Sequence, residues 1–193
     1  RVMQVLAEAT NVIAEGEVQQ LMNTHDASLD EAGYLRVIRS KTAKLFEASC
    51  LLAAVLAGAP PEVEAACAEY GLSLGTAFQV IDDVLDYEGD AAEMGKNLGD
   101  DLREGKATLP LILAMQLAPA DQAAIVRSAI ETGNTADLDA IVAIVRGCGA
   151  LERTKAAAAV QAQQAIDAIR GFEPNAYTNS LLELAAQLLL RRA

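Results

Sequence analysis

The fold is decided by residues 78–86, which read FQVIDDVLD. At about 100° per residue, polar side chains at positions i, i+3, i+4 and i+7 share a helix face roughly 60° wide. That face holds Gln79, Asp82, Asp83 and Asp86, and the opposite arc holds Leu74, Ala77, Val80, Ile81, Val84 and Leu85. The stretch therefore predicts a helix that buries one side and presents three carboxylates on the other.

The three carboxylates favour a bound cation over a solvated surface. An exposed helix face usually mixes both signs of charge, whereas no Lys or Arg lies between Pro61 and Lys96. Carboxylates about 5–6 Å apart repel by about 3 kcal/mol at an effective dielectric of ~20, and near a helix C-terminus they oppose its dipole. Asp oxygens select a hard ion, so this face is a candidate Mg²⁺ site, with a solvated face as the alternative. An EF-hand Ca²⁺ loop is disfavoured, because this Asp-Asp-x-x-Asp spacing lies on a helix.

Helical spacing continues on both sides of this stretch, and no strand-like alternation of any length is present. Ala makes up about a fifth of the 193 residues and aromatic residues only 4%, which favours closely packed helices. Ser28 to Glu31 has capping-box spacing, and Pro61 and Thr108 suit the starts of two further helices. We expect helices over residues 2–22, 28–58, 61–87, 121–132, 136–146, 150–170 and 174–192, with one more starting at 108.

The segment between residues 88 and 107 is polar and rich in Gly, so it is expected to be a functional loop or short broken helices. It carries two Gly-Lys pairs, which end at Lys96 and Lys106. In such a pair the Gly lets the backbone approach a phosphate closely, and the Lys adds positive charge. A Walker A loop is excluded, because Ala107 stands where Ser or Thr is required. The alternative is that both lysines are ordinary surface residues.

Two other polar groups are candidates for the same site. Lys41 and Thr42 lie in residues 36–44, where four basic residues are clustered. Lys41 lies about 140° around the predicted helix from Arg36, on a different side. Glu17 and Gln20 form an i,i+3 polar pair among apolar neighbours on the first helix. A solvated helix surface is the alternative for the neighbouring Arg36, Arg39 and Lys44, and the pattern alone does not decide whether Glu17 and Gln20 belong to a site.

The formal net charge of −12 disfavours nucleic acid and an anionic membrane surface as partners. More than half of this charge comes from residues 82–104, which contain nine acidic residues and only two basic ones, Lys96 and Arg103. No apolar run reaches the ~20 residues of a transmembrane helix, and no signal peptide is evident. Three isolated cysteines are typical of reduced thiols in a cytoplasmic protein. The single His25 disfavours His-based catalysis.

Residues 75–87 (GTAFQVIDDVLDY) resemble the second aspartate-rich motif of the trans-polyprenyl diphosphate synthases. Other stretches match the family in order and spacing, and the resemblance is nearest to bacterial long-chain enzymes of the octaprenyl type. These stretches are 13–18 (IAEGEV), 40–48 (SKTAKLFEA), 95–102 (GKNLGDDL) and 104–111 (EGKATLPL).

The resemblance implies an all-α, antiparallel helix bundle around an apolar cavity, assembled as a homodimer. It implies addition of isopentenyl diphosphate to an allylic diphosphate such as farnesyl or geranyl diphosphate, giving a long-chain all-trans product, the side chain of a quinone. Asp82, Asp83 and Asp86 would hold Mg²⁺, while Lys41, Thr42, Gln79 and Lys96 would contact the allylic diphosphate. Lys106, Glu17 and Gln20 complete the expected substrate site, and Lys41, Lys96, Asp82 and Asp83 its catalytic set.

The family's first Asp-Asp-x-x-Asp motif is not found in these 193 residues. We therefore expect residues 1–193 to form a single all-α domain, the C-terminal part of a longer synthase, which is inactive alone. The alternatives are a non-catalytic partner subunit of a synthase, a squalene-type class I synthase, and a helical scaffold with a solvated acidic face. Product length is not readable from this sequence.

Overall fold

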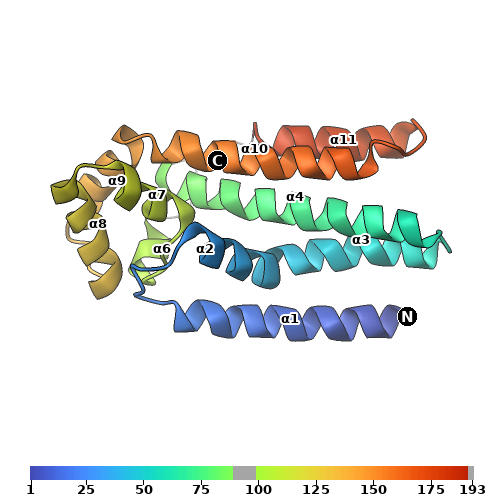
Figure 1. The fold of residues 1–193 in the computed structure, drawn as a ribbon, viewed down its shortest axis with the longest axis horizontal. Helices are drawn as coiled ribbons and strands as arrows, with labels where there is room; N and C mark the ends of the chain where they lie inside the picture. The colour runs from blue at the N-terminus through green and yellow to red at the C-terminus, as the bar shows by residue number, and fades with distance from the viewer. Residues whose placement is uncertain (89–98, 191–193) are drawn as a thin grey trace.

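The computed structural model describes residues 1–88 and 99–190, and in these ranges the regular elements are all helical. Figure 1 shows long helices side by side along the molecule, with the short helices α6 to α9 gathered at one end. The expected all-α fold is confirmed. The elements are α1 (Val2–Met22), α2 (Glu31–Ile38), the π-helix η1 (Arg39–Ala43), α3 (Lys44–Leu56), α4 (Pro61–Glu88), α6 (Asp100–Arg103), α7 (Leu109–Leu117), α8 (Ala120–Thr132), α9 (Leu138–Gly147), α10 (Ala150–Ile169) and α11 (Ala176–Leu188).

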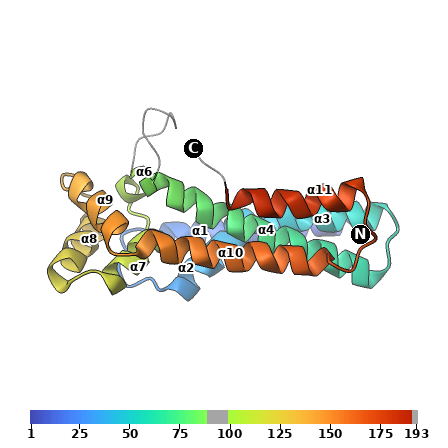
Figure 2. The same cartoon turned by 90° about the horizontal axis from the view of Figure 1, so that it is seen from above.

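Helix α4 is the central element of the bundle. It packs against α3 on one side and α10 on another, and both views show it between its neighbours (Figures 1 and 2). Its C-terminal half joins the main core with α7 and α9, whereas its N-terminal half packs with α10 and α11 in a second cluster. The apolar arc predicted around Val80 and Val84 is buried, as expected. One helix therefore contributes to both hydrophobic clusters, the main core at the short-helix end and the second cluster with α10 and α11.

Glycines allow the helices around α4 and α1 to approach closely. A Cβ atom added to Gly71 would lie 2.4 Å from the carbonyl oxygen of Phe46, and one added to Gly75 would lie 2.8 Å from Cα of Ala43. On α1, a Cβ atom added to Gly16 would lie 2.7 Å from the backbone nitrogen of Lys41. Only a residue without a side chain fits such contacts. The segment that carries Lys41 is thus held directly against both α1 and α4.

The expected capping box at Ser28 is wrong. The N-cap of α2 is Asp30, whose carboxylate accepts a hydrogen bond from the backbone N–H of Gly33 at 2.7 Å. Ser28 instead donates its hydroxyl to Asp26. Either residue has suitable side-chain chemistry for a cap, so residue type alone does not decide between them.

The single helix expected over residues 28–58 is divided into α2, η1 and α3. The π-helical turn from Arg39 to Ala43 inserts an extra residue into the α-helical ladder, a feature often found at functional sites. The helix at residues 61–87 is confirmed, and those expected after residue 120 agree within a few residues. Thr108 is the N-cap of α7 by position, without a side-chain hydrogen bond to the helix. Within the described ranges, no helix combines the length and hydropathy needed to cross a bilayer.

Candidate functional site

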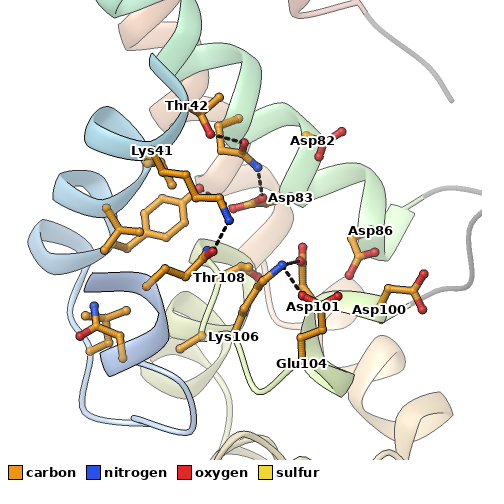
Figure 3. A pocket seen from close by; sticks show the side chains of 18 of the residues that line it. Lys41, Thr42, Asp82, Asp83, Asp86, Asp100, Asp101, Glu104, Lys106 and Thr108 are labelled. Atoms are coloured by element: carbon orange, nitrogen blue, oxygen red, sulfur yellow. Dashed lines mark hydrogen bonds and ion pairs between the residues drawn. The ribbon is translucent and has the colours of Figure 1, made fainter. Parts of the chain in front are cut away.

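A cavity of about 550 Å³ lies against the C-terminal half of α4. Its other walls come from the end of α1, the α2–η1 segment and the residues from α6 to the start of α7 (Figure 3). Among the predicted site residues that the structure describes, all but Glu17 line it: Gln20, Lys41, Thr42, Gln79, Asp82, Asp83, Asp86 and Lys106. Lys96 lies outside the described residues. Segments far apart in sequence therefore converge on one polar cavity.

The acidic face of α4 is not a solvated surface. Asp83 is only 2% exposed and Asp86 only 8%, and Asp82 is half-buried. Buried carboxylates are rare unless hydrogen bonds or ions compensate them, because leaving water penalises their charged form. The alternative of a plain exposed face is thus wrong for this helix, and its carboxylates face the cavity instead.

A hydrogen-bond chain crosses the wall between η1 and α4. Thr42 donates from Oγ1 to Oε1 of Gln79 at 3.0 Å, and Nε2 of Gln79 donates to Oδ1 of Asp83 at 2.8 Å. The second carboxylate oxygen of Asp83 accepts a 2.5 Å hydrogen bond from the hydroxyl of Tyr34 on α2. Figure 3 shows the chain from Thr42 to Asp83 within the cavity lining. Two predicted substrate contacts, Thr42 and Gln79, are thereby tied to a predicted metal ligand.

Burial dominates the electrostatics of Asp83. It raises the pKa of Asp83 to about 8, and the charges of Asp101 and Asp82 act in the same direction. The hydrogen bonds from Tyr34 and Gln79 lower that pKa but do not cancel the effect of burial. Burial, and then the charge of Asp83, raise the pKa of Tyr34 well above its usual value, so the tyrosine keeps its proton and acts as the donor.

Lys41 is held by the polar strip of α1. Its ammonium group lies 2.5 Å from Oε1 of Gln20 and 2.8 Å from Oε2 of Glu17. The expectation that these three residues belong together is supported, although Glu17 contacts the lysine from outside the cavity lining. The ion pair between Lys41 and Glu17 is partly exposed to solvent, so its contribution to folding stability is small. Its main effect is to orient the lysine side chain.

Lys106 enters the cavity from the turn before α7 (Figure 3). Its ammonium group pairs with Oδ1 of Asp101 at 3.0 Å and with Oε2 of Glu104 at 2.6 Å. Burial lowers the pKa of Lys106, but the two carboxylates outweigh burial and raise it above its usual value. The lysine is therefore charged, and it partly neutralises the acidic wall.

The donor set suits a hard cation. Among the residues the structure describes, no three His, Cys, Asp or Glu side chains are already arranged as a metal site. Six carboxylate side chains nevertheless line the cavity against Lys41 and Lys106, and mutual repulsion helps to raise the pKa of Asp83. Oxygen ligands of this kind are those that Mg²⁺ and Ca²⁺ prefer. The six are Asp82, Asp83, Asp86, Asp100, Asp101 and Glu104.

Several residues that line the cavity were not among the site residues predicted from the sequence. Tyr34, Asp101 and Thr108 all line the cavity, and Tyr34 and Asp101 act on Asp83. The concentration of acidic residues up to position 104 pointed to the Asp101 region. Tyr34 carried no such signal, because its role depends on how α2 folds back against α4.

Comparison with known proteins gives one consistent match. The family described as polyprenyl synthetase matches residues 1–146. Octaprenyl diphosphate synthase of Escherichia coli (strain K12) is 48% identical over 186 residues, covering 96% of this chain and 58% of that protein. A geranyl-diphosphate-specific all-trans-nonaprenyl-diphosphate synthase of Rhodobacter capsulatus is 42% identical over 93% of this chain and 55% of its own length. The chain thus spans just over half the length of these relatives.

A solved structure extends the similarity to three dimensions. A polyprenyl synthase from Caulobacter crescentus CB15, complexed with calcium and isoprenyl diphosphate, superposes with a TM-score of 0.93 at 44% sequence identity. The match covers 100% of this chain and 59% of the Caulobacter protein.

Proposed function

The chain belongs to the polyprenyl synthetase family, and we propose that it forms the allylic-diphosphate side of a prenyltransferase site. The observation that carries the proposal is the convergence of Lys41, Thr42, Gln79 and the carboxylates of α4 on one cavity. The similar Caulobacter synthase was solved with both a divalent cation and an isoprenyl diphosphate, which supports this choice of ligands.

In this proposal, Asp82, Asp83 and Asp86 hold Mg²⁺, the oxygen-preferring cation that suits their chemistry. Lys41, Lys96 and Lys106 supply positive charge to the diphosphate, and Thr42 and Gln79 supply hydrogen bonds. Glu17 and Gln20 orient Lys41 through the contacts made by α1.

The proposed reaction begins when the diphosphate of the allylic substrate leaves and an allylic cation forms. Bound Mg²⁺ would supply Lewis-acid stabilisation of the leaving group. The lysines place further positive charge where negative charge develops on the leaving diphosphate. The double bond of isopentenyl diphosphate then attacks the cation, and loss of a proton restores an alkene.

We propose a long-chain all-trans polyprenyl diphosphate as the product of the whole enzyme, made from farnesyl or geranyl diphosphate and isopentenyl diphosphate. The octaprenyl and nonaprenyl synthases among the relatives support this choice. A homodimer, a role in quinone side-chain synthesis and a cytoplasmic location remain part of the proposal. That the chain is one domain, the C-terminal part of a longer synthase, is likewise proposed. The family assignment disfavours the squalene-type and scaffold alternatives.

The proposal is tested by binding of inorganic diphosphate to the 193-residue chain, measured by calorimetry with and without Mg²⁺. Binding is expected to require Mg²⁺ and to weaken at least tenfold in Asp82→Asn, because one negative ligand to the cation is lost. Asp121→Asn is the matched control, since Asp121 is an exposed carboxylate in the first turn of α8. Binding that is independent of Mg²⁺, or equal loss in both variants, would contradict the proposal.

A further inference from the structure

We propose that Tyr34 is a positioning residue of this site, whose buried hydroxyl fixes the Asp83 carboxylate and, through Gln79, the hydroxyl of Thr42. The inference rests on the proposed function, because it assigns a task to a residue of the same cavity. Tyr34 belongs to none of the motifs that support the family resemblance. Its hydroxyl lies 2.5 Å from Oδ2 of Asp83.

The direction of each hydrogen bond follows from the chemistry of the groups. Asp83 occupies both of its oxygens, one with Tyr34 and the other with the amide nitrogen of Gln79. When Asp83 is ionised, as it would be with a cation bound, its carboxylate accepts only, so it fixes which end of the Gln79 amide faces it. The amide oxygen must then face η1, where it accepts from Thr42. The Tyr34 hydroxyl therefore anchors the carboxylate that orients the Gln79 amide and, through this amide, the Thr42 hydroxyl.

The backbone makes this arrangement rigid. Tyr34 is 3% exposed and Asp83 is 2% exposed, so water cannot easily replace the tyrosine as donor. Tyr34 and Thr42 lie at opposite ends of the α2–η1 segment, and both reach α4. The chain of hydrogen bonds therefore begins and ends on one segment and passes through α4 between them. Loss of the Tyr34 donor would free the Asp83 carboxylate to rotate away from Gln79, and the Gln79 amide would then lose the acceptor that orients it.

Tyr34→Phe tests the inference, because it keeps the buried ring and removes only the donor. We expect the affinity of the 193-residue chain for inorganic diphosphate in the presence of Mg²⁺ to fall about tenfold, measured by calorimetry. The matched control is Tyr70→Phe. Tyr70 is also buried and donates its hydroxyl to the carbonyl of Leu181, away from the cavity, so its loss should leave the affinity unchanged. Unchanged affinity in Tyr34→Phe, or equal loss in Tyr70→Phe, would overturn the proposal.

A double-mutant cycle with Asp83→Asn separates positioning from a general loss of stability. If Tyr34 acts through Asp83, Tyr34→Phe should weaken binding less than twofold in the Asp83→Asn background. The same tenfold effect in both backgrounds would show that Tyr34 acts independently of Asp83. Should Tyr34→Phe alone not fold, the comparison of Asp83→Asn with the double variant can still overturn the inference, because a tenfold loss there would show that Tyr34 acts independently of Asp83. Failure of the wild-type chain to bind would count against the proposed function instead.

Discussion

At the scale of single residues, Asp83 is a buried carboxylate whose pKa departs far from its usual value. It is buried beside other acidic side chains, yet both of its oxygens are hydrogen-bonded. Burial of a carboxylate favours its neutral form, and so its raised pKa couples protonation to folding. In the absence of a cation, this residue should cost the fold stability whenever it is ionised.

We predict that Asp83 lowers the stability of the metal-free chain as the pH rises from about 4 to about 8. Its pKa is near 3.8 when unfolded and about 8 when folded, so the folded state holds the extra proton in this window. Stability then falls by up to about 1.4 kcal/mol per pH unit from this group. Urea unfolding of the wild type and Asp83→Asn across this range checks the prediction. Parallel pH profiles for the two proteins would contradict it.

At the scale of secondary-structure elements, close helix contacts place the site residues. Gly71 and Gly75 let α3 and η1 lie directly against α4, which brings Thr42 within hydrogen-bond distance of Gln79. Asp30 fixes the start of α2 and therefore the position of Tyr34 one turn later. The local geometry of these helices thus controls the cavity wall.

Gly71→Ala is predicted to lower the free energy of unfolding by about 1–3 kcal/mol, the usual cost of overpacking a well-packed interior. The added methyl group would meet a backbone carbonyl, which cannot move without shifting α3. Gly147→Ala is the control, because apart from its chain neighbours and its own helix backbone no atom lies within 4 Å of the added Cβ. The control should be neutral or stabilise α9 by up to about 1 kcal/mol. Denaturant unfolding curves of the two variants measure the difference, and similar effects would refute the packing argument.

Asp30→Ala should destabilise the chain by about 1 kcal/mol, because it removes the N-cap of α2. Ser28→Ala should cost less than about 0.5 kcal/mol, since Ser28 is exposed and does not cap the helix. Chemical denaturation of both variants distinguishes the two residues. A larger loss at Ser28 would restore the capping box expected from the sequence.

At the scale of the whole molecule, the chain corresponds to only 58% of the length of its octaprenyl relative. We predict that a polypeptide of these 193 residues alone yields no condensation product from farnesyl and isopentenyl diphosphates. The family resemblance assigns two acidic motifs to the reaction, and the first of them is not found in these 193 residues. Incorporation of radiolabelled isopentenyl diphosphate into extractable product is the assay. Measurable product would show that one acidic motif suffices.

Local periodicity was enough to predict the helices and the acidic face. Asp82, Asp83 and Asp86 lie three and four residues apart on one helix, so their common face follows from helix geometry. Tyr34 and Asp101 reach Asp83 from other elements, and helix periodicity contains no information about such contacts. The prediction of Ser28 as helix cap failed for a different reason, because the structure uses Asp30, whose side chain is equally suited to a cap. What the sequence could not supply was the way separate helices meet.

The length of α4 also determines how occupancy of the site should be observed. The same helix contributes its C-terminal half to the cavity and its N-terminal half to a separate hydrophobic cluster. A ligand that binds only the folded state at 100 times its Kd adds about 2.7 kcal/mol to stability. Because α4 links both regions, that energy should be distributed across the bundle. The melting temperature of the entire chain then becomes a label-free readout of ligand binding at one end.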